Sequence, residues 1–265
     1  MMRSLWTAAS GMRAQQVNVD TIANNVANIN TIGYKSQQAS FKSLLYQNLQ
    51  STSTNNAGEN KPVAAEVGLG SRVAAITSTF TQGNLTHVEN PFSVALEGDG
   101  FFQIRTESGE LQYTRDGSFE ISPVANGNML CTSDGNPVLD AYGNQIILPS
   151  NRVATDLVVN QDGTLAFPDG TGNPAVITDA NGRPVKFGIY QFNNPAGLSK
   201  EGSNNYSVTV ASGAAVAENG NAAVKQTKTH QYYTEASNVD VANEMVNLIV
   251  AQRAYEMNSK AIQAS

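Results

Sequence analysis

The fold is decided at the N-terminus, by the stretch LWTAASGMRAQQVNVDTIANNVANI at residues 5–29. Apolar residues recur in it every seven positions, in one series of Leu5, Met12, Val19 and Val26 and a second of Ala8, Ile22 and Ile29, in which Gln15 is the one polar break. This is the a/d spacing of a coiled-coil seam, so it predicts a helix over about residues 4–30. Ser4 is a candidate N-cap, and Gly33 is a candidate for the left-handed residue just past the helix end.

The last 25 or so residues repeat this pattern. One series has Val241, Leu248, Tyr255 and Ile262, a second has Met245, Gln252 and Ser259, and the apolar surface is widened by Val246, Ile249, Val250 and Met257. Asp240 or Ser237 is a suitable N-cap. Two helices that pack only on each other bury one seam each, so we expect apolar surface on the C-terminal helix that neighbouring copies cover. The alternative is that both helices pack on the rest of their own chain.

Asn25 falls at the edge of the apolar stripe of the N-terminal helix. A polar residue at such a seam can set the register between packed helices. A solvated residue at the flank of the helix fits the same position equally well, and the sequence does not decide between the two.

Between the ends, short alternating runs are separated by turn residues. Phe92–Leu96 and Phe101–Ile104 flank Gly98-Asp99-Gly100, and Leu157–Val159 and Thr164–Phe167 flank Asp162-Gly163. Such runs predict antiparallel strands rather than βαβ units. We therefore predict an α+β fold with discontinuous terminal coiled-coil helices and a central, mainly antiparallel β domain. The expected segments are the N-terminal helical segment 1–33, an extended polar linker 34–68 that includes the tract at 51–60, the β domain 69–228, and a C-terminal helix within 229–265 that pairs with the first.

Composition excludes several classes of function. The chain has 265 residues, a net charge of −6 and only 14% charged residues, and it lacks the basic cluster that nucleic acids require. No apolar run reaches the ~18 residues of a membrane span, and residues 1–9 lack the pattern of a cleaved signal peptide. The single Cys131 rules out an intramolecular disulfide and argues against a zinc site. We expect no enzyme, no metal and no cofactor.

Three motifs in order resemble the flagellar basal-body rod and hook protein family. Ile22-Ala-Asn-Asn-Val-Ala-Asn-Ile-Asn-Thr-Ile-Gly-Tyr-Lys35 is similar to its N-terminal motif, and Gly98-Asp-Gly-Phe-Phe102 and Tyr113-Thr-Arg-Asp-Gly-Ser-Phe119 resemble its central β motifs. The segment from Ser237 to Lys260 resembles its C-terminal motif. Family members usually continue a few helical turns past the position that matches Ser265.

The resemblance implies a structural subunit of the distal rod, which polymerises helically into a rigid hollow driveshaft that transmits torque and conducts exported proteins. Phe41-Lys-Ser-Leu-Leu-Tyr-Gln47 and the polar insert that follows are similar to a rod-type insert, so residues 43–68 are expected to pack between subunits. The implied partners are copies of the chain, other rod subunits, hook protein and the flagellar type III export apparatus. Contacts with ring or bushing proteins and with peptidoglycan stay open. The implied location is the basal body, reached without a cleaved signal peptide.

Two alternatives remain. The first is a hook or proximal-rod subunit of the same family, which differs at residues 43–68. The second is an extracellular β-type binding module, which would protect its termini in the monomer. For the rod subunit, the residues expected at the assembly interface are Leu5, Met12, Val19, Ile22, Asn25, Val26, Ile29, Val241, Met245, Leu248, Ile249, Tyr255 and Ile262.

Overall fold

The computed structural model describes residues 2–50, 65–125, 127–150, 152–168, 174–179, 182–221 and 224–264. They form two compact units. Unit 1 comprises Met1–Ala27, Gln37–Thr79 and Val239–Ser265, and unit 2 comprises Asn28–Ser36 and Phe80–Asn238. The polar tract at 51–60 lies outside the described residues.

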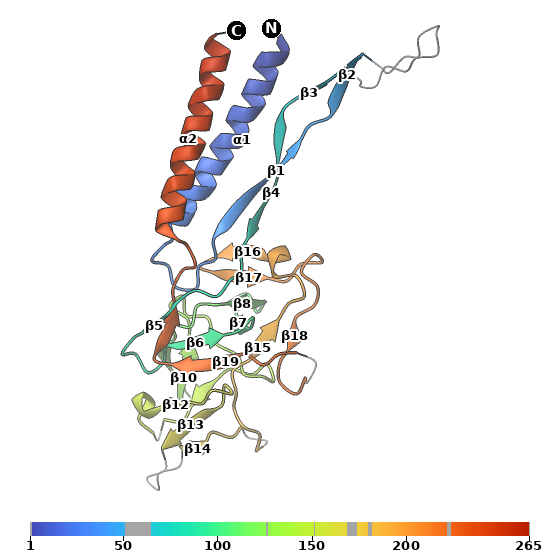
Figure 1. Ribbon diagram of the computed structural model, residues 1–265. Coiled ribbons are helices and arrows are strands. Elements are labelled where there is room, and N and C mark those ends of the chain that lie inside the picture. The colour runs from blue at the N-terminus through green and yellow to red at the C-terminus, as the bar shows by residue number, and fades with distance from the viewer. Residues whose placement is uncertain are drawn as a thin grey trace. The chain divides into compact units, whose positions relative to one another are not determined.

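Unit 1 consists of the two terminal helices and a β ribbon. Helices α1 (Met2–Ala27) and α2 (Val241–Gln263) lie side by side and antiparallel (Figure 1). The ribbon has four strands: β1 (Gln37–Ser43), β2 (Tyr46–Gln50), β3 (Ala65–Gly68) and β4 (Ser71–Ser78). Strand β1 pairs with β4 and β2 pairs with β3, both antiparallel. The terminal helices and the antiparallel strands confirm the α+β class.

The expected linker at 34–68 is corrected in its described part, because residues 37–43, 46–50 and 65–68 form the paired strands β1, β2 and β3. The expected boundaries at 69 and 228 also differ from the two units. Pairing with β1 keeps β4 in unit 1, and residues 228–235 form strands that pair within unit 2. Helix α2 therefore begins at Val241.

The helix ends follow local chemistry. The side chain of Asp240 accepts hydrogen bonds from the backbone N–H groups of Ala242 and Asn243, so the predicted N-cap of α2 is confirmed. Ser4 is not a cap, because α1 already begins at Met2. Helix α1 ends at Ala27, before Ile29. Gly33 has φ +69°, and a Cβ there would lie 2.9 Å from the backbone of Arg115, so only glycine fits this left-handed position.

Unit 2 is a β structure with antiparallel pairing throughout its described strands. Its strands are β5 (Leu85–His87), β6 (Val94–Glu97), β7 (Phe101–Arg105), β8 (Leu111–Thr114), β9 (Glu120–Val124), β10 (Gly127–Cys131), β11 (Ile147–Leu148), β12 (Val158–Val159), β13 (Leu165–Pro168), β14 (Pro174–Val176), β15 (Ile189–Gln191), β16 (Ser199–Gly202), β17 (Asn205–Ser207), β18 (Val216–Ala217), β19 (Lys228–Gln231) and β20 (Tyr233–Glu235). Short 3₁₀ helices cover Ala154–Asp156 and Pro195–Gly197.

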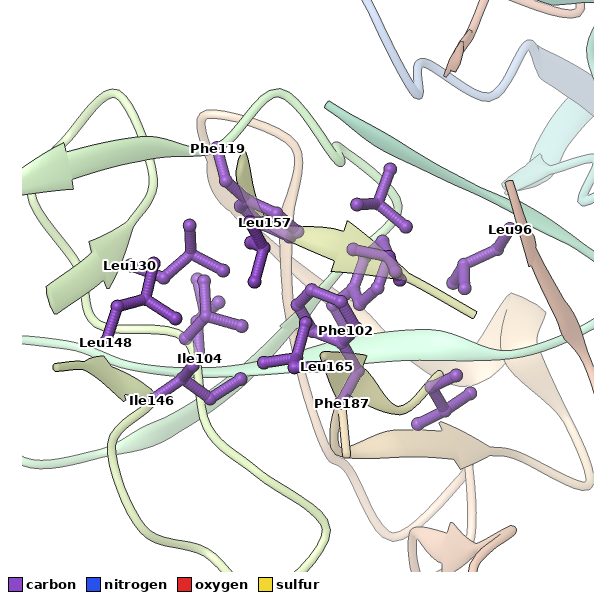
Figure 2. Close-up of a cluster of buried hydrophobic side chains, with 14 of the residues drawn as sticks. Leu96, Phe102, Ile104, Phe119, Leu130, Ile146, Leu148, Leu157, Leu165 and Phe187 are labelled. Carbon is purple, nitrogen blue, oxygen red and sulfur yellow. The ribbon is translucent and has the colours of Figure 1, made fainter. Parts of the chain in front are cut away.

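The largest sheet of unit 2 has six strands in the order β16-β17-β8-β7-β15-β18. Strand β7 is buried on both faces. Its Phe102 and Ile104 belong to the main apolar core, which Figure 2 shows with Phe119, Leu130 and Leu165 among others. On the other face, Phe101 packs with the rings of an aromatic cluster made of Tyr113, Phe192 and Tyr206. Unit 2 therefore has an apolar core of its own.

The predicted hairpins are partly right. Strands β12 and β13 pair across Asp162-Gly163, as the alternation predicts. Strands β6 and β7, on either side of Gly98-Asp99-Gly100, do not pair with each other: β6 pairs with β19 and β7 pairs with β8 and β15.

Candidate assembly surfaces

The two helices of unit 1 are held in one register. The side-chain amide of Asn25 donates to Glu244 Oε1 over 3.2 Å, and a Cβ placed on Gly11 would lie 3.0 Å from the side chain of Asn258. The two residue numbers of each pair add up to 269. Residue n of α1 therefore lies opposite residue 269 − n of α2. Gly11 permits this close approach because it has no side chain.

Asn25 also ties α1 to the ribbon. Its amide nitrogen donates to Gln37 O and its amide oxygen accepts from Gln37 N, both over 2.8 Å. The side chain is 1% exposed, so the reading of Asn25 as a solvated flank residue is wrong. It satisfies backbone groups at the start of β1 that burial would otherwise leave unpaired.

The structure separates the predicted interface residues into two sets. Ile22 and Asn25 are buried, and a further set is half-buried: Leu5, Met12, Val19, Val26, Ile29, Leu248 and Ile262. The exposed set is Val241, Met245, Ile249 and Tyr255. Ile29 lies in the turn region after α1 and within unit 2, so it is not part of the helix pair.

A compact apolar surface lies on the side of α2 that faces away from α1. We call it the outer patch: Met245, Val246, Ile249 and Val250, which are 55–62% exposed. At about 100° per residue these four positions are centred roughly opposite Ala251, the buried residue of α2. The sequence predicted that α2 has apolar surface that pairing with α1 does not bury. Within the described chain, the outer patch is such a surface.

A second apolar surface lies between α1 and the ribbon. We call it the α1 groove: it has a volume of about 860 Å³ and its lining includes Trp6, Ala9, Arg13, Val17, Leu44 and Val73. The ribbon touches α1 beside it, where Ser71 N donates to Ser10 Oγ over 3.3 Å. Trp6 is 74% exposed. Sequence reasoning missed the groove because one of its walls comes from the ribbon, at Leu44 and residues 71–73, which were not expected to lie beside α1.

Unit 2 contains a buried ionic cluster of Lys35, Arg115 and Glu235, each no more than 2% exposed. Glu235 accepts from Lys35 Nζ at 2.6 Å and from Arg115 Nη1 at 3.2 Å. Lys35 also donates to Thr81 O at 2.8 Å, and Gly83 N donates to Glu235 Oε1 at 2.8 Å. The cluster therefore holds together segments near residues 35, 81–83, 115 and 235. All of these except the segment at Arg115 lie close to points where the chain passes into or out of unit 2.

Burial has electrostatic consequences around this cluster. It lowers the pKa of the Lys35 ammonium, and the carboxylate of Glu235 opposes that shift. It also raises the pKa of the Tyr206 phenol, in the adjoining aromatic cluster, to about 12. Arg115 stacks over the ring of Phe101, with 5.1 Å from its Cζ to the ring centroid. Lys35 and Arg115 stand in the quoted motifs, but no spacing pattern indicated Glu235 as their partner.

The described residues hold no group of three or more His, Cys, Asp and Glu side chains placed to bind a metal ion. Cys131 is buried, and burial raises the pKa of its thiol, which disfavours the reactive thiolate. No helix among the described residues is both long and apolar enough to cross a membrane.

The ionic cluster predicts that Glu235→Gln strongly lowers the free energy of unfolding of unit 2. This change leaves two buried cations without their carboxylate, which costs about 3–5 kcal/mol of unfolding free energy. Urea unfolding followed by the near-ultraviolet circular dichroism of the tyrosines in unit 2 measures it. Glu107→Gln, which removes the same charge from an exposed position, is the matched control. Equal stability of the two variants would show that the cluster does not stabilise unit 2.

Tyr206 predicts an alkaline loss of stability. A phenol with a pKa near 12 when folded and about 10 when unfolded stabilises the fold fully below pH ~10 and ceases to do so as the pH approaches ~12. The loss amounts to about 2–3 kcal/mol at 1.36 kcal/mol per pKa unit. Unfolding free energies at several pH values should fall more steeply for the parent chain than for Tyr206→Phe. The lowered pKa of Lys35 acts in the opposite direction, but it is common to both proteins. Parallel pH profiles would contradict the prediction.

Comparison with known proteins adds three family matches. The model described as "Flagella basal body rod protein" matches residues 5–35, "Flagellar hook protein FlgE/F/G D1 domain" matches residues 95–167, and "Flagellar basal body rod FlgEFG protein C-terminal" matches residues 230–265. The matches include the α1 segment, part of unit 2 and all of α2.

Curated relatives resemble the chain over nearly their full length. The flagellar basal-body rod protein FlgG of Borreliella burgdorferi is 42% identical over 100% of this chain and 95% of its own. The FlgG of Caulobacter vibrioides is 37% identical with the same coverage. The FlgG of Bacillus subtilis is 34% identical over 100% of this chain and 96% of its own. Because the similarity reaches this level over whole chains, the protein belongs to the flagellar basal-body rod protein family and is a structural subunit of the flagellar rod.

Proposed function

We propose that this chain is the subunit of the distal rod. Many copies assemble head to tail into a straight, hollow helical shaft, which transmits torque and leaves a central path for exported proteins. The terminal helices form the inner part of the shaft, and all of the predicted interface residues except Ile29 lie on them. Neither catalysis nor a cofactor is part of this function.

The observation that carries the proposal is the outer patch. Apolar surface of this kind is costly in a soluble monomer and indicates a protein partner. A binding module would bury the apolar surface of its terminal helices within its own chain, whereas α2 presents four large side chains that are at least 55% exposed. Contacts with neighbouring copies would cover them, and a contact between two different surfaces builds an open filament when it does not close into a ring.

The proposed partners follow from assembly in the basal body. They are copies of the chain, other rod subunits, the hook protein at one end, and the flagellar type III export apparatus that delivers the subunit without a cleaved signal peptide. Nucleic acid and membrane insertion are not part of the proposal.

A hook or proximal-rod subunit is the second candidate. One comparison favours it: a Bacillus subtilis relative named flagellar hook-basal body complex protein FlhP is 33% identical over 99% of this chain. The ribbon separates the candidates. A long ribbon that packs between neighbouring subunits would resist the sliding that lets a filament bend, so it favours a straight rod.

The outer patch predicts that Ile249→Asp abolishes polymerisation. A carboxylate in a contact that excludes water cannot be solvated, while Ile249 is exposed enough in the monomer for the fold to change by no more than about 0.5 kcal/mol. Sedimentation and electron microscopy measure assembly, and circular dichroism checks folding. The control is Asn247→Asp, the same charge on an exposed residue about 200° away around α2. Leu248 is a poorer choice because it is half-buried.

If Ile249→Asp assembles like the parent chain while Asn247→Asp also assembles, the outer patch is not an assembly surface. Loss of assembly in both variants would mean that added charge on α2, rather than this surface, is responsible.

The ribbon predicts the straightness of the polymer. Removing residues 45–69 joins Leu44 to Gly70, whose backbone groups are already hydrogen-bonded over 2.9 Å, so the rest of the ribbon can close with a short turn. We expect the resulting polymer to be curved or readily bent in electron micrographs. A control that removes only residues 51–64 keeps β2 paired with β3 and should stay straight. A straight polymer from the larger deletion would favour a different origin of rigidity and count against the distal-rod assignment.

A further inference from the structure

Unit 1 carries two apolar surfaces that one copy cannot bring together. The outer patch lies on the side of α2 turned away from α1, and the α1 groove lies between α1 and the ribbon. Helix α1 therefore stands between the two surfaces. Any contact between them must join two copies, and because the surfaces differ, it is a head-to-tail contact.

The register of the helices sets the offset of such a contact. Since residue n of α1 lies opposite residue 269 − n of α2, residues 245–250 of α2 stand opposite residues 19–24 of α1. The part of α1 that lines the groove runs from Trp6 to Val17. The centre of the outer patch and the centre of the groove are therefore about ten residues apart along the helix pair, which is about 15 Å along the helix axis at 1.5 Å per residue.

The chemistry beside the two surfaces agrees with this placement. When the helices of two copies run in the same direction and the outer patch is level with the groove, Arg253 of one copy is level with Trp6 of the other. Arg253 is 73% exposed and Trp6 is 74% exposed, and an arginine over an indole face is a favourable cation–π pair. In the same alignment Glu256 is level with Arg3, which is exposed.

We propose that the outer patch of α2 in one copy docks into the α1 groove of a second copy, which is displaced by about 15 Å along the helix axis. This inference rests on the proposed polymer and names the two surfaces that meet in it. A contact between different surfaces with an axial displacement does not close into a ring, so each added copy offers a free groove or a free patch to the next.

Disulfide trapping tests the contact directly. In a Cys131→Ala background, Ala9→Cys places a thiol in the groove and Ile249→Cys places one in the outer patch. Within one copy these positions are 11 residues apart along the helix pair, about 16 Å, which is beyond the ~4.4–6.8 Å between Cα atoms that a disulfide spans. Any disulfide between them therefore joins two copies. The control pair is Ala9→Cys with Asn247→Cys, which is equally unable to bridge within one copy.

After mild oxidation of the assembled polymer, we expect non-reducing gels to show a ladder of cross-linked oligomers for the 9/249 pair and mainly monomer for the 9/247 pair. A polymer that gives no ladder with 9/249, or equal ladders with both pairs, overturns this contact and leaves the proposed function standing. Failure of the parent chain to polymerise at all contradicts the proposed function itself.

Discussion

A helix can bury only the side that it turns toward its partner, and this constraint shapes unit 1. Helices α1 and α2 meet along one register, fixed by the Asn25–Glu244 hydrogen bond and by the close approach of Gly11 to Asn258. That contact covers Ala251 but leaves Met245, Val246, Ile249 and Val250 outside it. The apolar residues that make α2 too broad for a two-helix pair are therefore the residues that the proposed contact with another copy would cover.

Polar interactions fix where the chain changes from one element to the next. Asn25 satisfies both backbone groups of Gln37, so α1 and β1 keep one relation although a turn region separates them. In unit 2, the Lys35–Glu235–Arg115 cluster links three segments that are distant in the sequence, and Lys35 and Glu235 lie close to points where the chain crosses between the units. A buried ion pair gives little net stability compared with an apolar replacement, yet it is costly to break. We infer that its contribution is to specify which segments meet.

The sequence predicted the features that depend on local periodicity. The seven-residue series found both helices, Asp240 was identified as an N-cap, and the turn at Asp162-Gly163 was placed between paired strands. It did not predict features that depend on distant partners. β6 and β7 flank a Gly-rich turn, but β6 pairs with β19, more than 120 residues away. β1 reads Gln-Gln-Ala-Ser-Phe-Lys-Ser, which lacks the alternation of a half-buried strand because its side chains are mostly exposed.

The same reasoning explains why the α1 groove escaped sequence analysis while the outer patch did not. The residues of a patch on one helix recur at helical spacing within one stretch of sequence, so the periodicity of the sequence predicts the patch. A groove needs two walls, and the wall opposite α1 is built by Leu44, Arg72 and Val73, which carry no pattern of their own. In a protein that polymerises, one of the two surfaces in each head-to-tail contact can be a groove of this kind. The sequence predicts a surface that lies on one helix, such as the outer patch. A groove between two segments, such as the α1 groove, can be recognised only in the folded structure.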